Sequence, residues 1–596
     1  MTSTAPDLST PFRADAAALG RRRLALVVPS AALVVVLWGL SWATLADGSH
    51  SLWDWLLLLP FCLVMGWECM VVWQLVLGAV AWARGPSGRS ALELRAERLE
   101  PVSTGRSRTA IAIPIHEEDP EAVRERVAVM LRSLARTGPL DDVDVHILSD
   151  TRTPAVAARE EAALAALRAA FPDAPVSYRR REQNLGRKAG NVMEFLDRTA
   201  GRYDFAIVLD ADSLMSGAAM RRLIRLMEES PAVGLIQTVS YATGRDTLFA
   251  RVQQFAVRLY APLPLRGLDF WQGPHASYWG HNAILRVEPF RRHCRLPVLP
   301  GRPPLGGEIL CHDVVEAALM ARAGWETHLL PDLEGTWEEM PTNALDLMAR
   351  ERRWCQGNLQ HMQVFAMPGL RGASRGHIAL GIGGYLTAVL WWMFLLGGAA
   401  RVLLEPERDG LGLLAYGLTE PSAVAGWLAA FCLTLLLLPR VLNLGRALLD
   451  SGTLRDFGGA PRLLVGAVAE QLFWLLLGPV LSLVNAGFVL RILFGQSVGW
   501  AGGDRGERRI GLGEALGRHG GHIVVGAALA WACVAAGGWY ALFTAPTALG
   551  LLLSPALTAV SASRPLGQAS RRLGLFLTVD DLATAPELAE LRAAEV

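Results

Sequence analysis

The chain has 596 residues, a formal net charge of +1, 52% hydrophobic residues and 19 tryptophans. This length leaves room for several domains, and the near-zero charge gives no indication of a nucleic-acid partner. Seven cysteines are scattered without a Cys-x-x-Cys pair, which favours free thiols over disulfides or a zinc site. The apolar residues gather towards both ends of the chain, and this distribution predicts a polytopic α-helical membrane protein with a polar domain in its middle.

The first 83 residues predict a short polar start and two membrane helices. Residues 1–23 begin polar and are expected to form a disordered cytosolic N-terminus. The stretches 24–45 and about 53–82 are each long enough to cross the ~30 Å hydrocarbon core of a bilayer, so residues 24–83 are assigned to two transmembrane helices. A cleaved signal peptide is the alternative, but the first stretch is too long for one and a second follows closely.

The charges around these stretches predict their orientation. Arg21, Arg22 and Arg23 precede the first stretch and Arg84 follows the second, whereas the link 46–51 carries no Lys or Arg. Cytoplasmic loops carry the excess of positive charge. The N-terminus and the domain after Arg84 are therefore expected in the cytoplasm.

Residues 84–377 have the composition of a folded cytosolic domain in which strand-like and helix-like segments alternate. This alternation predicts an α/β domain with a mixed, mostly parallel sheet and right-handed crossovers. The predicted strands are 109–115, 143–148, 176–178 and 205–209, and the predicted helices between them are 121–136 and 155–170.

Carboxylates follow two of these strands. Asp210 and Asp212, separated by one alanine, end the buried strand 205–209, and Asp150 follows the strand 143–148. Ligands bind beyond the carboxyl ends of parallel strands, and paired carboxylates suit Mg²⁺ or Mn²⁺ shared with substrate phosphates. The alternatives are a polar turn for the aspartate pair, and a helix cap instead of a base or ribose contact for Asp150.

Lys188 is the only lysine in the chain and lies between Gly186 and Gly190. In so arginine-rich a composition, a compact ammonium suggests a point contact to phosphate, although chance is the competing explanation. The glycines permit close approach of a ligand to the backbone.

Further along the chain, Trp279, His281 and Asn282 combine an aromatic face with hydrogen-bonding groups, as carbohydrate sites do; a core loop anchored by its tryptophan is the alternative. A helix is predicted from Glu308 to about Ala323. Asp313, near its start, is a candidate general base or a simple N-terminal charge. His312 is expected to pack rather than to bind a ligand.

Arg350, Arg353 and Trp354 share one face of a predicted helix just before the next apolar stretch. One interpretation is a basic helix that touches anionic lipid headgroups. The other is a diphosphate clamp with a tryptophan platform for a sugar.

The C-terminal part, 378–562, is predicted to form transmembrane or interfacial helices, followed by a cytosolic tail, 563–596. The stretch 464–494 is expected to cross an even number of times, as a tight pair, a re-entrant segment or an interfacial helix, because Arg-rich residues after 563 should stay inside. Six to eight spans result, with both termini cytoplasmic. The apolar stretches are 378–400, 423–445, 464–494, 522–543 and 546–562.

Taken in order, these motifs resemble the processive family-2 glycosyltransferases, the group of cellulose, chitin and hyaluronan synthases. Two positions depart from that family's pattern, because Arg350 replaces a usual Gln and Cys311-His312 replaces a usual Thr-Glu. Segments 280–286, 311–318 and 353–358 are more similar to the branch that makes osmoregulated periplasmic glucans. The matching motifs are Pro114 with Glu117, Asp150, Lys188, Asp210-Ala211-Asp212, Asp313, and Arg350-x-x-Arg353-Trp354.

The resemblance implies a GT-A fold and a multi-pass enzyme of the bacterial inner membrane. Such an enzyme transfers glucose from UDP-glucose with inversion and extends a linear β-1,2-glucan, with Mg²⁺ or Mn²⁺ as cofactor. It contacts membrane lipids and passes the growing glucan across the membrane. Acyl carrier protein is a partner implied by the family. The implied roles are nucleotide binding by Pro114, Glu117 and Asp150; diphosphate binding by Lys188, Arg350 and Arg353; metal binding by Asp210 and Asp212, with Asp210 also facing the donor; general-base catalysis by Asp313; and acceptor binding by Trp279, His281, Asn282 and Trp354.

Three alternatives stay open. The first is another processive β-glycan synthase, of the cellulose type. The second is a transferase that places one sugar on a polyprenyl phosphate, although the Arg-x-x-Arg-Trp motif speaks against it. The third is a non-enzymatic membrane regulator built on a degenerate transferase, which the full set of carboxylates disfavours.

Overall fold

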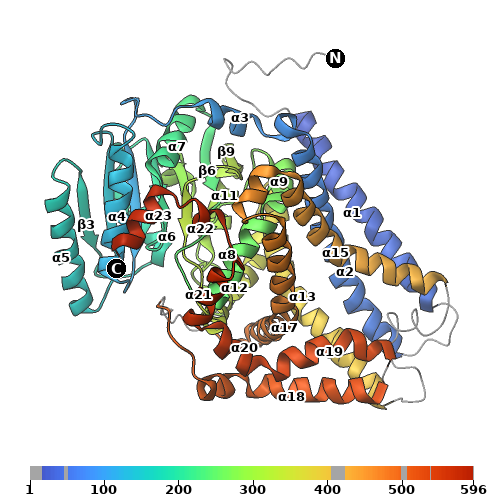
Figure 1. The fold of residues 1–596 in the computed structure, drawn as a ribbon. Helices are drawn as coiled ribbons and strands as arrows, with labels where there is room; N and C mark the ends of the chain where they lie inside the picture. The colour runs from blue at the N-terminus through green and yellow to red at the C-terminus, as the bar shows by residue number, and fades with distance from the viewer. Residues whose placement is uncertain (1–15, 46–51, 405–422, 498–505, 537, 595–596) are drawn as a thin grey trace.

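The computed structural model describes residues 16–45, 52–404, 423–497, 506–536 and 538–594. Residues 85–365 form an α/β unit, here called the sheet domain, and long apolar helices lie beside it and below it (Figure 1). The chain enters the sheet domain from the second long helix and leaves it into the third. The functional residues predicted from the sequence all lie in the sheet domain.

A seven-stranded sheet of order β3-β2-β1-β4-β8-β6-β9 forms the centre of the domain. Strand β8 runs antiparallel to β4 and β6, and the other neighbours pair in parallel. The sheet is therefore mixed and mostly parallel, as predicted. Its strands are β1 (Thr109–Ile115), β2 (Val143–Ser149), β3 (Val176–Arg180), β4 (Phe205–Val208), β6 (Val233–Thr238), β8 (Ala283–Arg286) and β9 (Glu326–Leu330).

Helices cover both faces of this sheet because its central strands are apolar on both sides. In β1, Ile111 and Ile113 belong to the core on one face, whereas Ala110 and Ala112 belong to the core on the other. The first face carries α3 (Ala91–Arg98), α4 (Pro120–Ala135), α5 (Pro154–Ala170) and α7 (Gly217–Glu229). The second carries α6 (Arg187–Arg198), α10 (Val287–His293) and α11 (His312–Arg322).

A three-stranded sheet of order β5-β10-β7 lies beside the main one. It brings the chain after the Asp-x-Asp motif next to the chain that leads into α12 (Ala344–Phe365). The neighbouring helices are α8 and α9. The bounds are β5 (Leu214–Met215), β7 (Tyr241–Ala242), β10 (Thr336–Glu338), α8 (Leu248–Tyr260) and α9 (Pro262–Gln272).

The four predicted strands and the two predicted helices are confirmed within one or two residues at each end. The predicted helix from Glu308 is wrong at its start, because α11 begins at His312. Residues 299–311 form a loop, closed by a bridge between Leu299 and Gly307 and by a hydrogen bond from Leu310 N–H to Gln360 on α12.

Among the described residues, five helices are long and apolar enough to cross a membrane, and a sixth candidate is α19 (Gly538–Leu552) with α20 (Ser554–Ser561), bent by 62° at their break. The tight pair and the re-entrant segment expected within 464–494 are wrong, because α17 is one uninterrupted helix that contains Pro479. The five helices are α1 (Ala16–Leu45), α2 (Leu52–Ala83), α13 (Gly372–Leu404), α15 (Ala423–Leu449) and α17 (Ala460–Leu493).

Two further bounds differ from the sequence prediction. Residues 16–23 are the first turns of α1 rather than disordered, while residues 1–15 lie outside the described part. The predicted stretches 522–543 and 546–562 are divided differently, because α18 (Leu512–Ala536) ends before α19 begins, and Pro546 lies inside α19.

The segment after the last apolar helix folds back onto the sheet domain (Figure 1). It contains α21 (Arg564–Arg572), α22 (Val579–Leu582) and α23 (Pro586–Ala594), and is here called the C-terminal segment. Its Leu588 and Leu591 are part of the core under α4, and its Asp581 forms a buried ion pair with Arg251 of α8 at 2.6 Å.

Candidate functional site

The two carboxylates of the Asp-x-Asp motif lie in a tight turn directly after β4. The N–H of Asp210 donates to the Ser213 hydroxyl at 2.9 Å, and the N–H of Ser213 donates to the Asp210 carbonyl at 3.1 Å. Both carboxylates are half-buried, whereas Ser213 and the residues after it are buried. The turn therefore presents both carboxylates at the edge of the sheet from a fixed backbone.

Lys188 forms an ion pair with Asp210 from the first turn of α6. Two left-handed residues place it there, Gly186 at φ +65° and Arg187 at φ +52°. Gly190 allows the loop to close, because a Cβ at this position would lie 2.0 Å from the carbonyl oxygen of Leu185. The glycines around the lysine thus shape the loop that delivers the ammonium to the carboxylate.

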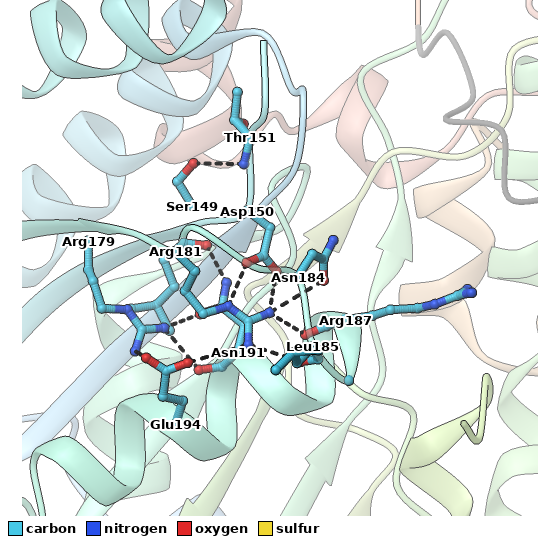
Figure 2. Close-up of polar contacts among 12 residues, drawn as sticks. Ser149, Asp150, Thr151, Arg179, Arg181, Asn184, Leu185, Arg187, Asn191 and Glu194 are labelled. Atoms are coloured by element: carbon cyan, nitrogen blue, oxygen red, sulfur yellow. Dashed lines mark hydrogen bonds and ion pairs between the residues drawn. The ribbon is translucent and has the colours of Figure 1, made fainter. Parts of the chain in front are cut away.

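Asp150 binds Arg181 in a buried, bidentate ion pair, with distances of 2.6 Å and 2.8 Å. Figure 2 shows that the same guanidinium reaches into the turn before α6. It donates to the carbonyl oxygens of Leu185 and Arg187, both at 3.0 Å. Asp150 therefore orders the Lys188 loop through Arg181, a partner that the sequence analysis did not identify.

Glu117 holds backbone at the ends of β1 and β2. Its carboxylate accepts hydrogen bonds from the N–H groups of Arg152 and Thr153, at 2.8 Å and 2.9 Å. Slight burial would raise the pKa of Glu117, but these N–H donors lower it overall. Pro114, half-buried in β1 opposite Leu148 of β2, lies at the same end of the sheet.

Asp313 lies next to the lysine–aspartate pair. Gly280, at φ +87°, lies close to both Asp313 and Lys188. A Cβ at this position would lie 3.6 Å from Asp313 Oδ2 and 3.7 Å from Lys188 Nζ. Asp313 is the second residue of α11 and lies in the first turn of that helix. Three predicted site residues thus lie close together: Asp313 from α11, Lys188 from α6, and Asp210, the ion-pair partner of Lys188, from the turn after β4.

Helix α12 fixes the start of α11. The imidazole of His361 lies 2.7 Å from the Cys311 carbonyl oxygen, and Gln360 bonds the loop before it. Gly357 packs against Cys311 so closely that a Cβ would lie 2.3 Å from its Sγ and 2.8 Å from its backbone nitrogen. His312 bonds Glu316 at 2.8 Å, which agrees with the packing role predicted for it.

The loop 279–282 is braced by Gln237, which the sequence analysis also missed. Its amide accepts from Trp279 N–H at 2.8 Å and donates to the His281 carbonyl oxygen at 2.9 Å. Asn282, at φ +47°, is fully buried and bonds the Trp337 carbonyl oxygen at 3.3 Å. Asn282 therefore shapes the loop, while Trp279 and His281 are half-buried and lie nearer the surface.

His281 pairs with a carboxylate that the sequence analysis did not single out. Its Nε2 lies 3.4 Å from Glu338 of β10. Burial alone would lower the pKa of His281, but the negative charges of Glu338 and Asp210 raise it. Burial raises the pKa of Glu338, against the influence of His281. Glu338 lies 57 positions after His281 in the sequence, and no local sequence pattern identifies it as a partner.

The basic helix face predicted on α12 is present. Arg350 is half-buried and stacks on the Trp354 ring, with 4.5 Å from its Cζ to the ring centroid. Trp354 keeps 43% of its surface exposed. Arg353 lies one turn after Arg350 and is half-buried. Trp354 is the aromatic residue of this group, and its exposed surface is available to a ligand.

Asp210 and Asp212 fit a divalent cation that is shared with a ligand. Within the described residues, no three His, Cys, Asp or Glu side chains converge as a complete metal cage. An ion held by the two carboxylates would take its other ligands from phosphate oxygens or water, which is the coordination that Mg²⁺ prefers.

Comparison with known proteins places the chain in a family. Residues 110–294 match the model of glycosyl transferase family 2, and residues 205–439 match that of glycosyl transferase family group 2. A solved mannosyltransferase from Pyrobaculum calidifontis, in complex with GDP-mannose and Mn²⁺, covers 66% of this chain and 99% of its own, at 15% identity and a TM-score of 0.41.

Curated proteins named glucans biosynthesis glucosyltransferase H are similar along nearly the whole chain. That of Xylella fastidiosa is 35% identical over 97% of this chain and 91% of its own length. That of Caulobacter vibrioides is 36% identical over 94% and 85%, and that of Ralstonia nicotianae is 37% identical over 96% and 67%. These matches confirm the resemblance read from the motifs, and the chain belongs to the glucans biosynthesis glucosyltransferase H family of glycosyltransferases.

Proposed function

We propose that the protein is an inverting glucosyltransferase that transfers glucose from UDP-glucose to a growing glucan and makes the linear β-1,2-linked backbone of osmoregulated periplasmic glucans. The observation that carries this proposal is that Asp313 and Lys188 both lie close to Gly280, while Lys188 pairs with Asp210. A base candidate, a phosphate-binding cation and a metal-type carboxylate together suit an inverting transfer from a nucleotide sugar, with a base for the acceptor and positive charge for the leaving diphosphate. The donor and the linkage come from the family resemblance.

The nucleotide end of the donor would lie at the carboxyl ends of β1 and β2, along Pro114, Glu117 and Asp150. The Glu117 and Asp150 carboxylates are already bonded to backbone N–H groups and to Arg181. Their main role in the proposal is to hold the pocket and the Lys188 loop in shape. Carboxylates have spare lone pairs, so a ribose hydroxyl can still donate to Asp150.

The transfer step places a proton on Asp313. Its carboxylate takes the proton from an acceptor hydroxyl, the hydroxyl oxygen bonds to the anomeric carbon, and the bond from that carbon to the phosphate oxygen breaks with its electron pair leaving on UDP. Attack opposite the leaving group inverts α to β. Lys188, Arg350 and Arg353 would stabilise the charge that grows on the diphosphate.

Asp210 and Asp212 would hold Mg²⁺ or Mn²⁺, which supplies Lewis-acid neutralisation of the diphosphate when bound. Asp210 is shared between this role and Lys188, so the lysine keeps the carboxylate oriented towards the donor before the ion binds. The exposed ring of Trp354 would form the floor under the acceptor sugar, and Trp279 and His281 would contact it from the loop that Asn282 shapes.

The position in the cell follows the same proposal. The protein lies in the bacterial inner membrane with the sheet domain and both termini in the cytoplasm, and the apolar helices guide the polar glucan across. The five candidate helices and the bent pair supply an even number of crossings, if each crosses once. Acyl carrier protein is carried over as a partner from the family.

The test is turnover of radiolabelled UDP-glucose by the purified full chain in liposomes with Mg²⁺, with and without acyl carrier protein, followed by sizing and linkage analysis of the product. A β-1,2-glucan absent from an Asp313→Asn preparation supports the proposal. A β-1,4-linked polymer would assign it to the cellulose type, a single glucose on a polyprenyl phosphate to lipid-carrier glycosylation, and no turnover with any nucleotide sugar to a regulatory role.

A further inference from the structure

The C-terminal segment reaches the backbone that carries Asp212. Only the buried residues 213–216 separate Asp212 from the first residue of α7, Gly217. The N–H of Gly217 donates to the hydroxyl of Ser133 on α4 at 2.7 Å. The same hydroxyl donates to the carboxylate of Glu587, the second residue of α23. Three elements far apart in the sequence are thus joined through one hydroxyl group.

The hydrogen-bonded series Gly217–Ser133–Glu587 is here called the relay, and burial and close packing constrain its three residues. Ser133 is 2% exposed and Glu587 is 7% exposed, so water does not compete for these bonds. Gly217 cannot carry a side chain, because a Cβ would lie 2.4 Å from the Ser133 carbonyl oxygen. Arg136 also bonds the Glu587 carboxylate, at 2.9 Å. The Ser133 hydroxyl therefore donates to Glu587 and accepts from Gly217, which uses its one proton and one of its lone pairs.

The geometry points to Glu587 as a positioning residue for the metal-type carboxylate. We infer that the C-terminal segment, through Glu587 and Ser133, holds the residues from Asp212 through β5 to Gly217 in the conformation that binds the divalent cation with UDP. Leu588 and Leu591 of the same helix line a small void together with Asp212 and Glu338, so the helix also backs the acidic side of the site. The inference rests on the proposed role of Asp212 and names the part of the chain that sustains it.

The test compares variants of the full chain by two measurements. The first is the affinity for Mn²⁺ in the presence of UDP, measured by electron paramagnetic resonance. The second is the change in the KM for UDP-glucose compared with the change in kcat. Glu587→Ala and Ser133→Ala are each expected to weaken Mn²⁺ binding about 2- to 30-fold, the range of coupling through a packed network. Glu587→Gln keeps an acceptor and is expected to retain most of the affinity. Glu590→Gln is the matched control, because Glu590 lies on the same helix and bonds Arg132 and Arg136 at the surface, away from Ser133.

The double variant makes the relay falsifiable even where stability falls. If Glu587 acts through Ser133, the losses in Mn²⁺ affinity of the two single variants do not add in the Ser133→Ala/Glu587→Ala double variant. Additive losses, or equal losses in Glu590→Gln, overturn the inference. Asp212→Ala separates the two proposals: unchanged Mn²⁺ binding in that variant refutes the metal role of Asp212, whereas weakened binding there with normal binding in Glu587→Ala refutes only the relay.

Discussion

Lys188, the only lysine in the chain, forms an ion pair with Asp210, the first carboxylate of the Asp-x-Asp motif. The contact joins the start of α6 to the end of β4 and leaves the ammonium close to Gly280 and Asp313. A compact cation fits this space, whereas the broad guanidinium of arginine is a poor substitute.

Replacing Lys188 tests this arrangement. Lys188→Met is expected to lower kcat about 10²-fold or more, because a preorganised donor to the developing charge on UDP is lost. Lys188→Arg is expected to recover only a small part of the rate. Arg198→Met, an exposed position on the same helix, is the control and should keep full activity. Full rescue by arginine would contradict the requirement for a compact ammonium.

Replacing Asp313 tests the proton transfer. Asp313→Asn is expected to lower kcat about 10²–10⁴-fold with little change in the KM for UDP-glucose, because the amide cannot accept the acceptor's proton. Initial rates at saturating donor, together with UDP binding as proof of an intact pocket, measure this effect. Turnover within a few-fold of the wild-type rate would remove Asp313 from the role of base.

The Asp150–Arg181 pair predicts a stability effect. Both side chains are about 5% exposed, and removal of one partner leaves an uncompensated buried charge that costs about 3–5 kcal/mol. Arg181→Met should therefore lower the Tm and raise the KM for the donor, because the Lys188 loop loses its anchor. The double variant Asp150→Asn/Arg181→Met should be less destabilised than the sum of its parts. An unchanged Tm in Arg181→Met would argue against this anchor.

Gly357 predicts a steric effect at a distance. In Gly357→Ala the new methyl group would displace Cys311 and the start of α11, at a cost of about 1–3 kcal/mol. We expect a lower Tm and a lower kcat, because Asp313 moves with Cys311. Gly398→Ala is the matched control, since that helical glycine has no atom within 4 Å of its added Cβ. Equal effects of the two substitutions would refute the close contact as the cause.

His146 predicts acid sensitivity of the sheet domain. Burial lowers its pKa to about 4, from 6.5, while its ring bonds Tyr203 at 2.8 Å. The unfolded chain binds a proton below pH 6.5 and the folded chain only near pH 4, so stability is complete above pH 6.5 and falls as the pH drops towards 4, by at most about 3 kcal/mol. The Tm of the wild type should therefore fall more between pH 7 and pH 5 than that of His146→Gln. Parallel pH profiles would contradict this assignment.

Much of the fold could be read from local patterns. The strand 109–115 alternates small and branched apolar residues between turn signals, and the structure gives the same bounds. The carboxylates after strands were found for the same reason. Their partners were not, because Arg181, Gln237 and Glu338 are ordinary polar residues until the fold brings them to Asp150, Trp279 and His281.

The errors have a common physical origin. Gly478-Pro479 suggested a break, but α17 continues through it. A proline is tolerated inside a long apolar helix because neighbouring groups can satisfy the backbone group that it frees. The C-terminal segment was expected to be a plain tail. Its pairing of Glu587 with Arg136 spans 451 positions, and no sequence window reveals such a contact.

The course of the C-terminal segment has a consequence for biosynthesis. Leu588 and Leu591 complete a core whose other members begin at Leu92, yet the ribosome makes them only after every long apolar helix of the chain. During synthesis, the core of the sheet domain therefore stays incomplete until those helices have been made. Under the proposed function, full activity is thereby delayed until the helices proposed to guide the glucan have been made. A translation product that stops short of α23 leaves apolar surface of this core exposed, which quality-control proteases recognise.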